Sequence, residues 1–268
     1  MLIDFHTHIF PDKIAERTLG VLKAGVLKQE KVHSISYFDG TKSGLIDAMS
    51  KSGVDISVTL PIATKPTQTE SINSFANNVT DAKIISFASL HPANDNIDKI
   101  LENIKDANFY GIKLHPEFQG FFVDSPECIK ILKKAEELKL YTVFHAGADI
   151  GLPPPVHSTP KHFKNTLEYV SGKYIIAAHL GGWRMWDDVE KYIVGTNMYF
   201  DTAFIKDYIS PEQALRIIRN HNSEKILFGS DNPWENPKDT LDFLNSLGLS
   251  RNELDNITYI NALKILNI

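Results

Sequence analysis

Short apolar runs return along the whole chain, and longer amphipathic stretches separate them. The runs are rich in Ile, Val, Phe and Tyr, end at Gly, Pro, Asn or a polar residue, and are too short for ordinary helices, so they predict β-strands. Apolar and polar residues do not alternate cleanly within them, which favours strands covered on both faces, as in a parallel sheet. The runs are residues 2–6, 56–62, 84–91, 110–116, 141–147, 174–182, 198–203 and 226–234.

The stretches between these strands predict helices, because their apolar residues recur every three or four positions. Residues 125–139 begin with Ser125 and Pro126, a typical helix start. Further helices are expected at residues 96–106, 161–172, 210–220 and 237–248, with a closing helix or two short ones at residues 250–267.

Eight strands alternating with helices predict an α/β fold, a single (β/α)8 TIM barrel, for which about 250 residues is the usual size. About 35 residues lie between His8 and the helix expected at residues 44–53, and they include another helical pattern at residues 12–25. An insertion after the first strand belongs at the C-terminal rim of a barrel, so we expect a partial lid. The sequence contains no linker, and we expect residues 1–268 to form one domain.

Composition excludes several classes of protein. The net charge of −5 and the lack of a Lys/Arg stripe argue against nucleic-acid binding. The single cysteine, Cys128, excludes an internal disulfide framework and a thiolate metal cluster, and we expect it in the core. No apolar segment approaches the roughly 18 residues that span a bilayer, and no signal peptide is visible. We therefore expect a cytoplasmic protein that acts on a small molecule, with no nucleic-acid or membrane partner.

Two histidines stand at the end of the first strand, in the stretch DFHTH. His6 and His8 are two residues apart, so on a strand both side chains point to the same face. Two imidazoles in this arrangement can bind one metal ion, and Asp4 on the same face could orient a ligand ring. For an isolated pair, two histidines hydrogen-bonded in a polar loop are the structural alternative.

Polar residues at the ends of later strands favour the metal site. His145, His179 and Asp231 each end an apolar strand, immediately before a small or turn residue. Because the strands of a parallel barrel share one direction, these side chains should gather with the first pair at the C-terminal mouth. Imidazoles with a carboxylate and no thiolate suit zinc, iron, manganese or nickel.

Lys113 and His115 stand on one face at the end of the fourth strand. A lysine inside an apolar strand is costly to bury unless it is paired or modified. It could anchor a substrate carboxylate, bridge two metal ions as a carbamylated lysine, or pair with a core acid such as Asp4. We expect His115, Trp183 and Trp234 to contact the substrate, although the tryptophans could instead pack against loops. His91 is expected to close a turn, and His33, His157, His162 and His221 are expected on the surface.

With DFHTH, FHAG, AHLGG and GSDNPW in this order, the chain resembles the amidohydrolase superfamily. It is most similar to the amidohydrolase-related branch that includes aminocarboxymuconate-semialdehyde decarboxylase and benzoate-type decarboxylases. Each motif lies on its own expected strand, so the likeness covers the whole chain. AHLGG is similar to the decarboxylase branch, which binds one metal ion, whereas KLHP resembles the KLYP around the lysine that bridges two ions in dihydroorotase.

The resemblance implies that Asp231 and His179 are catalytic, with His179 assisting proton transfer or steadying a bound water. It implies one divalent ion, with zinc as the first expectation and manganese, iron, nickel or a second ion as alternatives. The metal ligands that it implies are His6, His8, His145 and Asp231, with Lys113 as an additional ligand.

A metal ion held in this way lowers the pKa of bound water to about 7. We therefore expect a metal-dependent hydrolase that cleaves an amide, ester or lactone bond of a small carboxylated substrate. Asp231 would accept a proton from the water and His179 would deliver one to the leaving group. The alternative is a metal-dependent, non-oxidative decarboxylase of an aromatic or unsaturated carboxylic acid. A metal-free lactonase, a non-catalytic binding barrel and a homodimer stay open.

Overall fold

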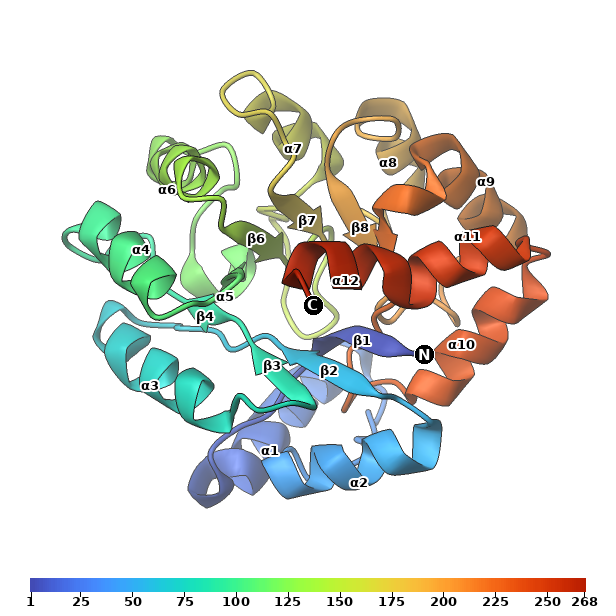
Figure 1. The fold of residues 1–268 in the computed structure, drawn as a ribbon, viewed down its shortest axis with the longest axis horizontal. Coiled ribbons are helices and arrows are strands. Elements are labelled where there is room, and N and C mark those ends of the chain that lie inside the picture. The colour runs from blue at the N-terminus through green and yellow to red at the C-terminus, as the bar shows by residue number, and fades with distance from the viewer.

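A ring of short parallel strands surrounded by helices forms the centre of the computed structural model, which describes all residues from 1 to 268 (Figure 1). Successive strands pair in parallel within two runs, β1-β2-β3 and β4 to β9. This arrangement confirms the predicted α/β barrel. The strands are β1 (Ile3–Thr7), β2 (Ile56–Thr59), β3 (Ile84–Ser86), β4 (Ala88–Ser89), β5 (Gly111–Leu114), β6 (Tyr141–Phe144), β7 (Ile175–Ala177), β8 (Tyr199–Asp201) and β9 (Ile226–Leu227).

Backbone contacts join the first strand to the last and close the ring. The amide of Phe5 donates to the carbonyl of Phe228 at 2.8 Å, and a parallel bridge links Thr7 to Asn232. Residues from the two ends of the sequence therefore lie side by side at the centre of the molecule. This closure is what lets DFHTH and GSDNPW contribute to one site.

The third predicted strand is divided into β3 and β4, with Phe87 between them. The amide of Phe87 donates to the carbonyl of Thr59 at 2.9 Å, so this residue still contacts β2. Beyond the break, β4 pairs with β5. The eight predicted strands are thus all present, and the division of one of them leaves their order unchanged.

Most helices between the strands lie where the sequence predicts them, and several begin at a polar residue followed by proline. The hydroxyl of Ser125, for example, accepts a hydrogen bond from the amide of Cys128 at 3.3 Å, with Pro126 at the first helical position. The helices are α1 (Asp12–Glu30), α2 (Lys42–Ser52), α3 (Thr69–Val79), α4 (Ile97–Asp106), α5 (Pro116–Gln119), α6 (Pro126–Glu137), α7 (Pro160–Thr166), α8 (Trp186–Tyr192), α9 (Pro211–His221), α10 (Pro237–Ser246), α11 (Arg251–Asp255) and α12 (Asn261–Leu266).

Four helices differ from the prediction, and one of them is the four-residue α5, which lies where no helix is expected. Helix α7 ends at Thr166 rather than near residue 172, because the chain turns after Leu167. Helices α3 and α8 also lie where no helix is expected. In α3, Ile72, Phe75, Ala76 and Val79 recur at helical spacing, so the pattern supports this helix and the prediction missed it. Helix α8 is only seven residues long, which is too short for a clear periodic signal.

Two hydrophobic layers stabilise the barrel. A larger cluster lies between the strands and the surrounding helices and includes the buried Cys128, as expected. A smaller cluster joins Phe5 of β1, Val143 of β6 and Phe87, which lies between β3 and β4, to Ile265 of α12. Helix α12 crosses the end of the barrel that faces the viewer in Figure 1. It closes that end, which leaves the opposite, C-terminal end for the polar residues.

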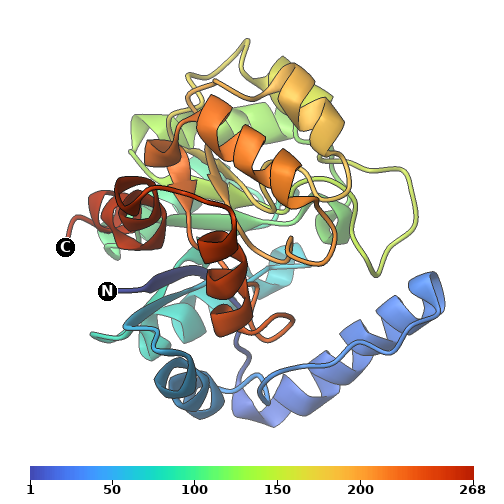
Figure 2. The same cartoon turned by 90° about the vertical axis from the view of Figure 1, so that its right-hand side faces the viewer.

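Helix α1 is the insertion predicted after the first strand, and it extends along one side of the molecule (Figure 2). The carboxylate of Glu30 in its last turn forms an ion pair with Arg184 at 2.8 Å. Near the same end, a Cβ on Gly25 would lie 3.5 Å from the carbonyl oxygen of Gly151. The insertion therefore reaches loops that follow β6 and β7, as expected of a partial lid. None of the helices combines the length and hydropathy that a membrane-spanning segment needs.

Candidate active site

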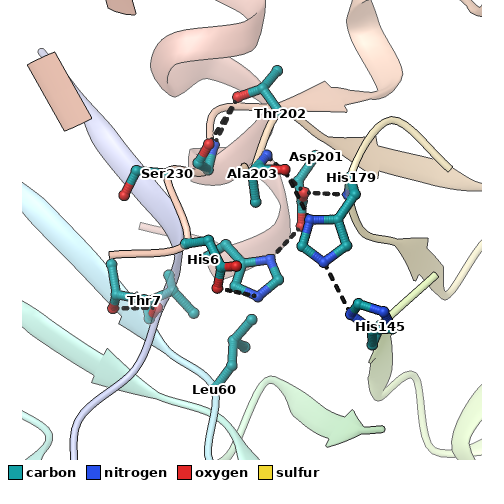
Figure 3. Close-up of polar contacts among 12 residues, drawn as sticks. His6, Thr7, Leu60, His145, His179, Asp201, Thr202, Ala203 and Ser230 are labelled. Carbon is teal, nitrogen blue, oxygen red and sulfur yellow. Dashed lines mark hydrogen bonds and ion pairs between the residues drawn. The ribbon is translucent and has the colours of Figure 1, made fainter. Parts of the chain in front are cut away.

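The polar residues that end the predicted strands come together at the C-terminal end of the barrel. The ring centres of His6 and His179 are 5.4 Å apart, and those of His179 and His145 are 4.8 Å apart (Figure 3). All three side chains are at least nine-tenths buried. Residues from β1, from the end of β6 and from the end of β7 therefore line a single, largely enclosed site.

Strand β1 departs from the regular alternation on which the expectation for Asp4 depends. Its register with β2 shifts between Asp4 and Thr7, which is typical of a β-bulge. Asp4 accepts hydrogen bonds from the amide and hydroxyl of Ser230 and from the backbone amide of His6 at 3.2 Å. The prediction that Asp4 orients a ligand ring is therefore wrong, because its carboxylate supports the backbone instead.

His6, His8 and Asp231 form one group that fits a metal ion, with ligating atoms within 4.8 Å of one another. The Nε2 atoms of His8 and His6 lie 3.0 Å and 3.5 Å from one oxygen of Asp231. The Nδ1 atom of His8 lies 3.0 Å from the carbonyl of Leu60, and Nδ1 of His6 lies 2.8 Å from Asp201. The carbonyl of Leu60 can only accept, so His8 donates from Nδ1 and its Nε2 presents a lone pair toward Asp231. His6 can present its Nε2 in the same way, and this donor set suits a divalent cation.

The charges of this group also suit a cation. Burial opposes ionisation of Asp231, but His6 and His8 prevail and lower its pKa to about 2. Burial and the nearby Lys113 hold the pKa of His6 well below its usual value. At neutral pH the group therefore offers a carboxylate and a neutral imidazole, which are the forms that bind metal.

His179 is held in place by contacts on three sides. Its backbone has a left-handed conformation, with φ of 59°, and its amide donates to Asp201 at 2.8 Å. The indole of Trp186 donates to its carbonyl at 3.0 Å, and its Nδ1 lies 2.8 Å from the carbonyl of Ala203. These contacts leave Nε2 free, and it lies 3.1 Å from Nδ1 of His145.

One alternative from the sequence was that Lys113 pairs with Asp4. The two side chains do not form this pair. Its side chain is buried, and its ammonium nitrogen lies 3.4 Å from Nε2 of His6. Burial lowers the pKa of Lys113 to about 8, although the carboxylates of Asp201 and Asp231 oppose this shift. Lys113 therefore adds a positive charge directly beside the candidate metal site.

A second group, His115, His145 and Asp149, also has ligating atoms within 4.8 Å of one another. Nε2 of His115 lies 3.2 Å from a carboxylate oxygen of Asp149. The rings of His115 and His145 are stacked, with centres 4.3 Å apart and planes only 10° from parallel. In-plane lone pairs of stacked rings do not converge on one point, so this geometry favours a hydrogen-bonded cluster. The expectation that His145 binds the same ion as His6 and His8 stays a prediction.

The tryptophans occupy different environments. Trp183 is buried, donates from its indole to the carbonyl of Phe204 at 3.1 Å, and stacks against the guanidinium of Arg184. It therefore presents little surface to a ligand. Trp234 is half-buried, and its amide donates to the carbonyl of Asp231 at 2.8 Å. A role for either residue in substrate binding stays a prediction.

Asp201 is the main site residue that the sequence reasoning missed. It ends β8 as part of MYFDTA and is completely buried. One carboxylate oxygen contacts His6 and the other accepts the amides of His179 and Ala203. A Cβ on Gly229 would lie 2.8 Å from Cβ of His6, so the glycine at this position makes room for the ring. The available signal was the position of Asp201 at a strand end, which it shares with His145, His179 and Asp231.

The remaining histidines were expected on the surface or, for His91, in a turn. His33 is exposed, His157 and His162 are half-buried, and the Nδ1 of His91 accepts from the amide of Ala93 and so closes a turn. His221 is buried, and the prediction for it is wrong. It lies on the inner face of α9, where it stacks on Phe200 with ring centres 3.8 Å apart.

Comparisons with known proteins agree with this architecture. Several solved structures, including the following three, are similar over 100% of this chain. A 2,6-dihydroxybenzoate decarboxylase in complex with 2,6-dihydroxybenzoate has 14% identity and a TM-score of 0.68 over 99% of its chain. A 5-carboxyvanillate decarboxylase from Novosphingobium aromaticivorans with bound manganese has 12% identity and a TM-score of 0.73 over 97% of its chain. An amidohydrolase II structure has 18% identity and a TM-score of 0.70 over 100% of its chain.

No curated protein matched the sequence. The amidohydrolase family model, however, matches residues 3–268, which is nearly the whole chain. This match includes every strand of the barrel and all the polar residues that meet at its C-terminal end. The chain therefore belongs to the amidohydrolase family of enzymes.

Proposed function

We propose that this enzyme is a metal-dependent, non-oxidative decarboxylase of a small aromatic or unsaturated carboxylic acid. The observation that carries the proposal is the buried ammonium of Lys113, 3.4 Å from Nε2 of His6 and thus beside the candidate metal site. Two adjacent positive charges suit a substrate carboxylate better than a neutral amide or ester. The structural similarity to two decarboxylases of aromatic acids supports this choice over hydrolysis.

Three residues would hold the metal ion: His6 and His8 through Nε2, and Asp231 through its carboxylate. A divalent cation there would supply positive charge that orients the carboxylate and stabilises the electrons left on the substrate when CO2 departs. Zinc is the expectation from the sequence, and manganese is suggested by the ion bound in the 5-carboxyvanillate decarboxylase.

Lys113 would bind the carboxylate of the substrate before the reaction. Its pKa of about 8 means that it is mostly protonated at neutral pH. Burial excludes water that would otherwise compete for the ammonium group, and this strengthens its attraction for an anion. The carboxylate that Lys113 binds is lost as neutral CO2, so the product is held less tightly than the substrate.

His179 would carry the proton that replaces the carboxyl group. Its Nδ1 donates to the carbonyl of Ala203, and Nε2 of His145 donates to the carbonyl of Ala148 at 3.1 Å. The two remaining nitrogens face each other at 3.1 Å, and two lone pairs repel at this distance unless one proton lies between them. Burial and the adjacent His115 hold the pKa of His145 well below its usual value, so we assign this proton to His179.

The proposed reaction then balances with no redox cofactor. The bond between the substrate carbon and its carboxylate breaks, and both electrons stay on the carbon. CO2 leaves, and the carbon takes the proton from Nε2 of His179. One proton is consumed for each CO2 released, and it returns to the pair of histidines from solvent.

Hydrolysis is the second candidate, and one observation favours it. Asp231 remains ionised down to a pH of about 2 and lies 3.0 Å from Nε2 of His8. An ionised carboxylate at this position could accept a proton from a water that attacks an ester, lactone or amide. The same residues would then act on a carbonyl group instead of a carboxylate.

The two candidates can be separated in heavy water. The enzyme, loaded with manganese or zinc, is incubated in D2O with a panel of hydroxybenzoates and unsaturated acids, and with a second panel of esters and lactones. We expect release of CO2 and one deuterium at the carbon that carried the carboxyl group. Turnover of the second panel alone would establish hydrolysis and overturn the proposal.

A further inference from the structure

The carboxylate of Asp201 contacts two parts of the site at once (Figure 3). One oxygen, Oδ2, lies 2.8 Å from Nδ1 of His6. The other, Oδ1, accepts the amides of His179 at 2.8 Å and Ala203 at 3.0 Å. The group is completely buried and is joined to His6 across 195 positions of sequence.

We infer that Asp201 is a positioning residue that selects the metal-binding tautomer of His6. A neutral imidazole carries its proton on one nitrogen only. Because Asp201 as a carboxylate can only accept, His6 has to place its proton on Nδ1. Its Nε2 is then free of a proton and faces Asp231, where the proposed ion would bind. This inference rests on the metal site of the proposed function.

The substitution Asp201→Asn would keep the shape of the side chain but replace one acceptor oxygen with an NH2 donor. The two backbone amides of His179 and Ala203 are donors, so the oxygen of the new side chain must stay beside them. The NH2 group is then directed at Nδ1 of His6 and donates to it. His6 has to move its proton to Nε2, the nitrogen that should bind the ion. An almost isosteric change therefore blocks the ligand.

Asp4 provides a matched control. It is also a completely buried carboxylate next to His6, but it contacts only the backbone amide of that residue and the side chain and amide of Ser230. In Asp4→Asn the oxygen can keep both backbone amides. The NH2 group then faces the hydroxyl of Ser230, which can rotate and accept. Asp4→Asn thus makes the same chemical change at a similar depth without acting on the imidazole.

The test measures metal affinity and the His6 tautomer rather than turnover. Mn2+ is titrated into wild type, Asp201→Asn and Asp4→Asn, and the bound ion is followed by electron paramagnetic resonance. We expect Asp201→Asn to bind 10- to 100-fold more weakly, and Asp4→Asn to stay within about threefold of wild type. Equal affinity of Asp201→Asn and wild type would overturn the inference.

Nitrogen-15 spectra of histidine-labelled protein without metal give a second readout that a merely structural role would not change. We expect His6 to carry its proton on Nδ1 in wild type and on Nε2 in Asp201→Asn, with other ring signals largely retained. A proton on Nε2 in wild type would refute the inference without any variant. If wild type binds no Mn2+ while its His6 proton lies on Nδ1 and moves to Nε2 in Asp201→Asn, the proposed metal site fails, whereas control of the His6 tautomer by Asp201 stands.

Discussion

Histidines in two regions of this molecule differ in the hydrogen-bond partners of their ring nitrogens. Under α9, His221 uses both ring nitrogens: Nε2 donates to the carbonyl of Met198 at 2.8 Å, and Nδ1 accepts from the amide of Gly195 at 3.1 Å. At the C-terminal end of the barrel, His8 and His179 each direct one nitrogen at a backbone carbonyl. Their other nitrogens face only ionisable side chains of the site.

Burial alone does not distinguish these two kinds of histidine. His221 and His179 are 2% and 3% exposed, so they are equivalent by that measure. What separates them is whether hydrogen bonds to the backbone use both nitrogens or one. A nitrogen left over after the backbone contacts are made can bind an ion or carry a proton.

The largest effect should come from the proton carrier. His179→Gln removes the proposed proton donor and should lower kcat for decarboxylation by 10²- to 10⁴-fold. The measurement is CO2 release with the metal-loaded enzyme. His221→Gln, compared at a temperature where both variants are folded, should keep kcat within about threefold of wild type. A smaller loss for His179→Gln than for His221→Gln would invalidate the distinction between the two regions.

Metal binding should stabilise the variant His221→Gln, which leaves the candidate metal site intact, but not the variant His8→Gln, which removes one of its ligands. A ligand at 100 times its Kd raises the free energy of unfolding by about 2.7 kcal/mol. We expect Mn2+ or Zn2+ to stabilise wild type and His221→Gln by this amount, and His8→Gln much less at the same concentration. Chemical denaturation with and without metal, after treatment with a chelator, provides the measurement. An equal response of His8→Gln would place the ion elsewhere.

The pH dependence of the free energy of unfolding should report on the buried His221. Burial lowers the pKa of His221 to about 4 from an ordinary 6.5, so the unfolded chain binds a proton at a higher pH than the folded one. The contribution of His221 to stability is complete above pH 6.5 and is lost as the pH falls toward 4. Between pH 7 and pH 5 this loss amounts to about 2 kcal/mol.

The comparison of wild type with His221→Gln isolates this contribution. We expect the urea midpoint of wild type to fall more steeply between pH 7 and pH 5 than that of the variant. The other buried histidines are unchanged in both proteins, so their effects cancel in the difference. Parallel pH curves would mean that His221 is not held neutral in the folded state.

The smallest effect should come from the ion pair between Glu30 of α1 and Arg184, which lies outside both regions. The two side chains are 29% and 40% exposed, and water screens such pairs. Glu30→Gln should therefore lower the free energy of unfolding by only about 0.2–1 kcal/mol. Urea denaturation at low and high salt checks this, because the small difference should shrink as salt rises. A loss above about 2 kcal/mol would indicate that α1 depends on this contact.

The barrel could be predicted because its signal is local and repeated. Each strand is a short apolar run, and the helices with a clear apolar face, such as α6 and α9, lie where their periodicity predicts. The prediction missed α8, which is too short for a clear periodicity, and it also missed α3, although Ile72, Phe75, Ala76 and Val79 recur there at helical spacing. It also failed for His221, because a histidine in an amphipathic helix reads as polar whether it faces solvent or core.

The candidate site was predictable in position but not in detail. A polar residue after each apolar strand must lie at the same end of a parallel barrel, which is why His6, His145, His179 and Asp231 meet. The partner of the His6 ring could not be predicted. A shift of register between Asp4 and Thr7 removes Asp4 from that role, and Asp201 takes it from a strand at the other end of the sequence.

The fold class, the end of the barrel where the polar residues gather, and the types of those residues can be derived from the sequence alone, because they follow from patterns within one strand or helix. The nitrogen of each histidine that has no backbone partner, and the carboxylate that faces each ring, become visible only in the folded barrel. Those outcomes depend on hydrogen bonds a few ångströms long between residues as far apart as His6 and Asp201. A shift of one residue in a strand is enough to change them, and no local pattern records it.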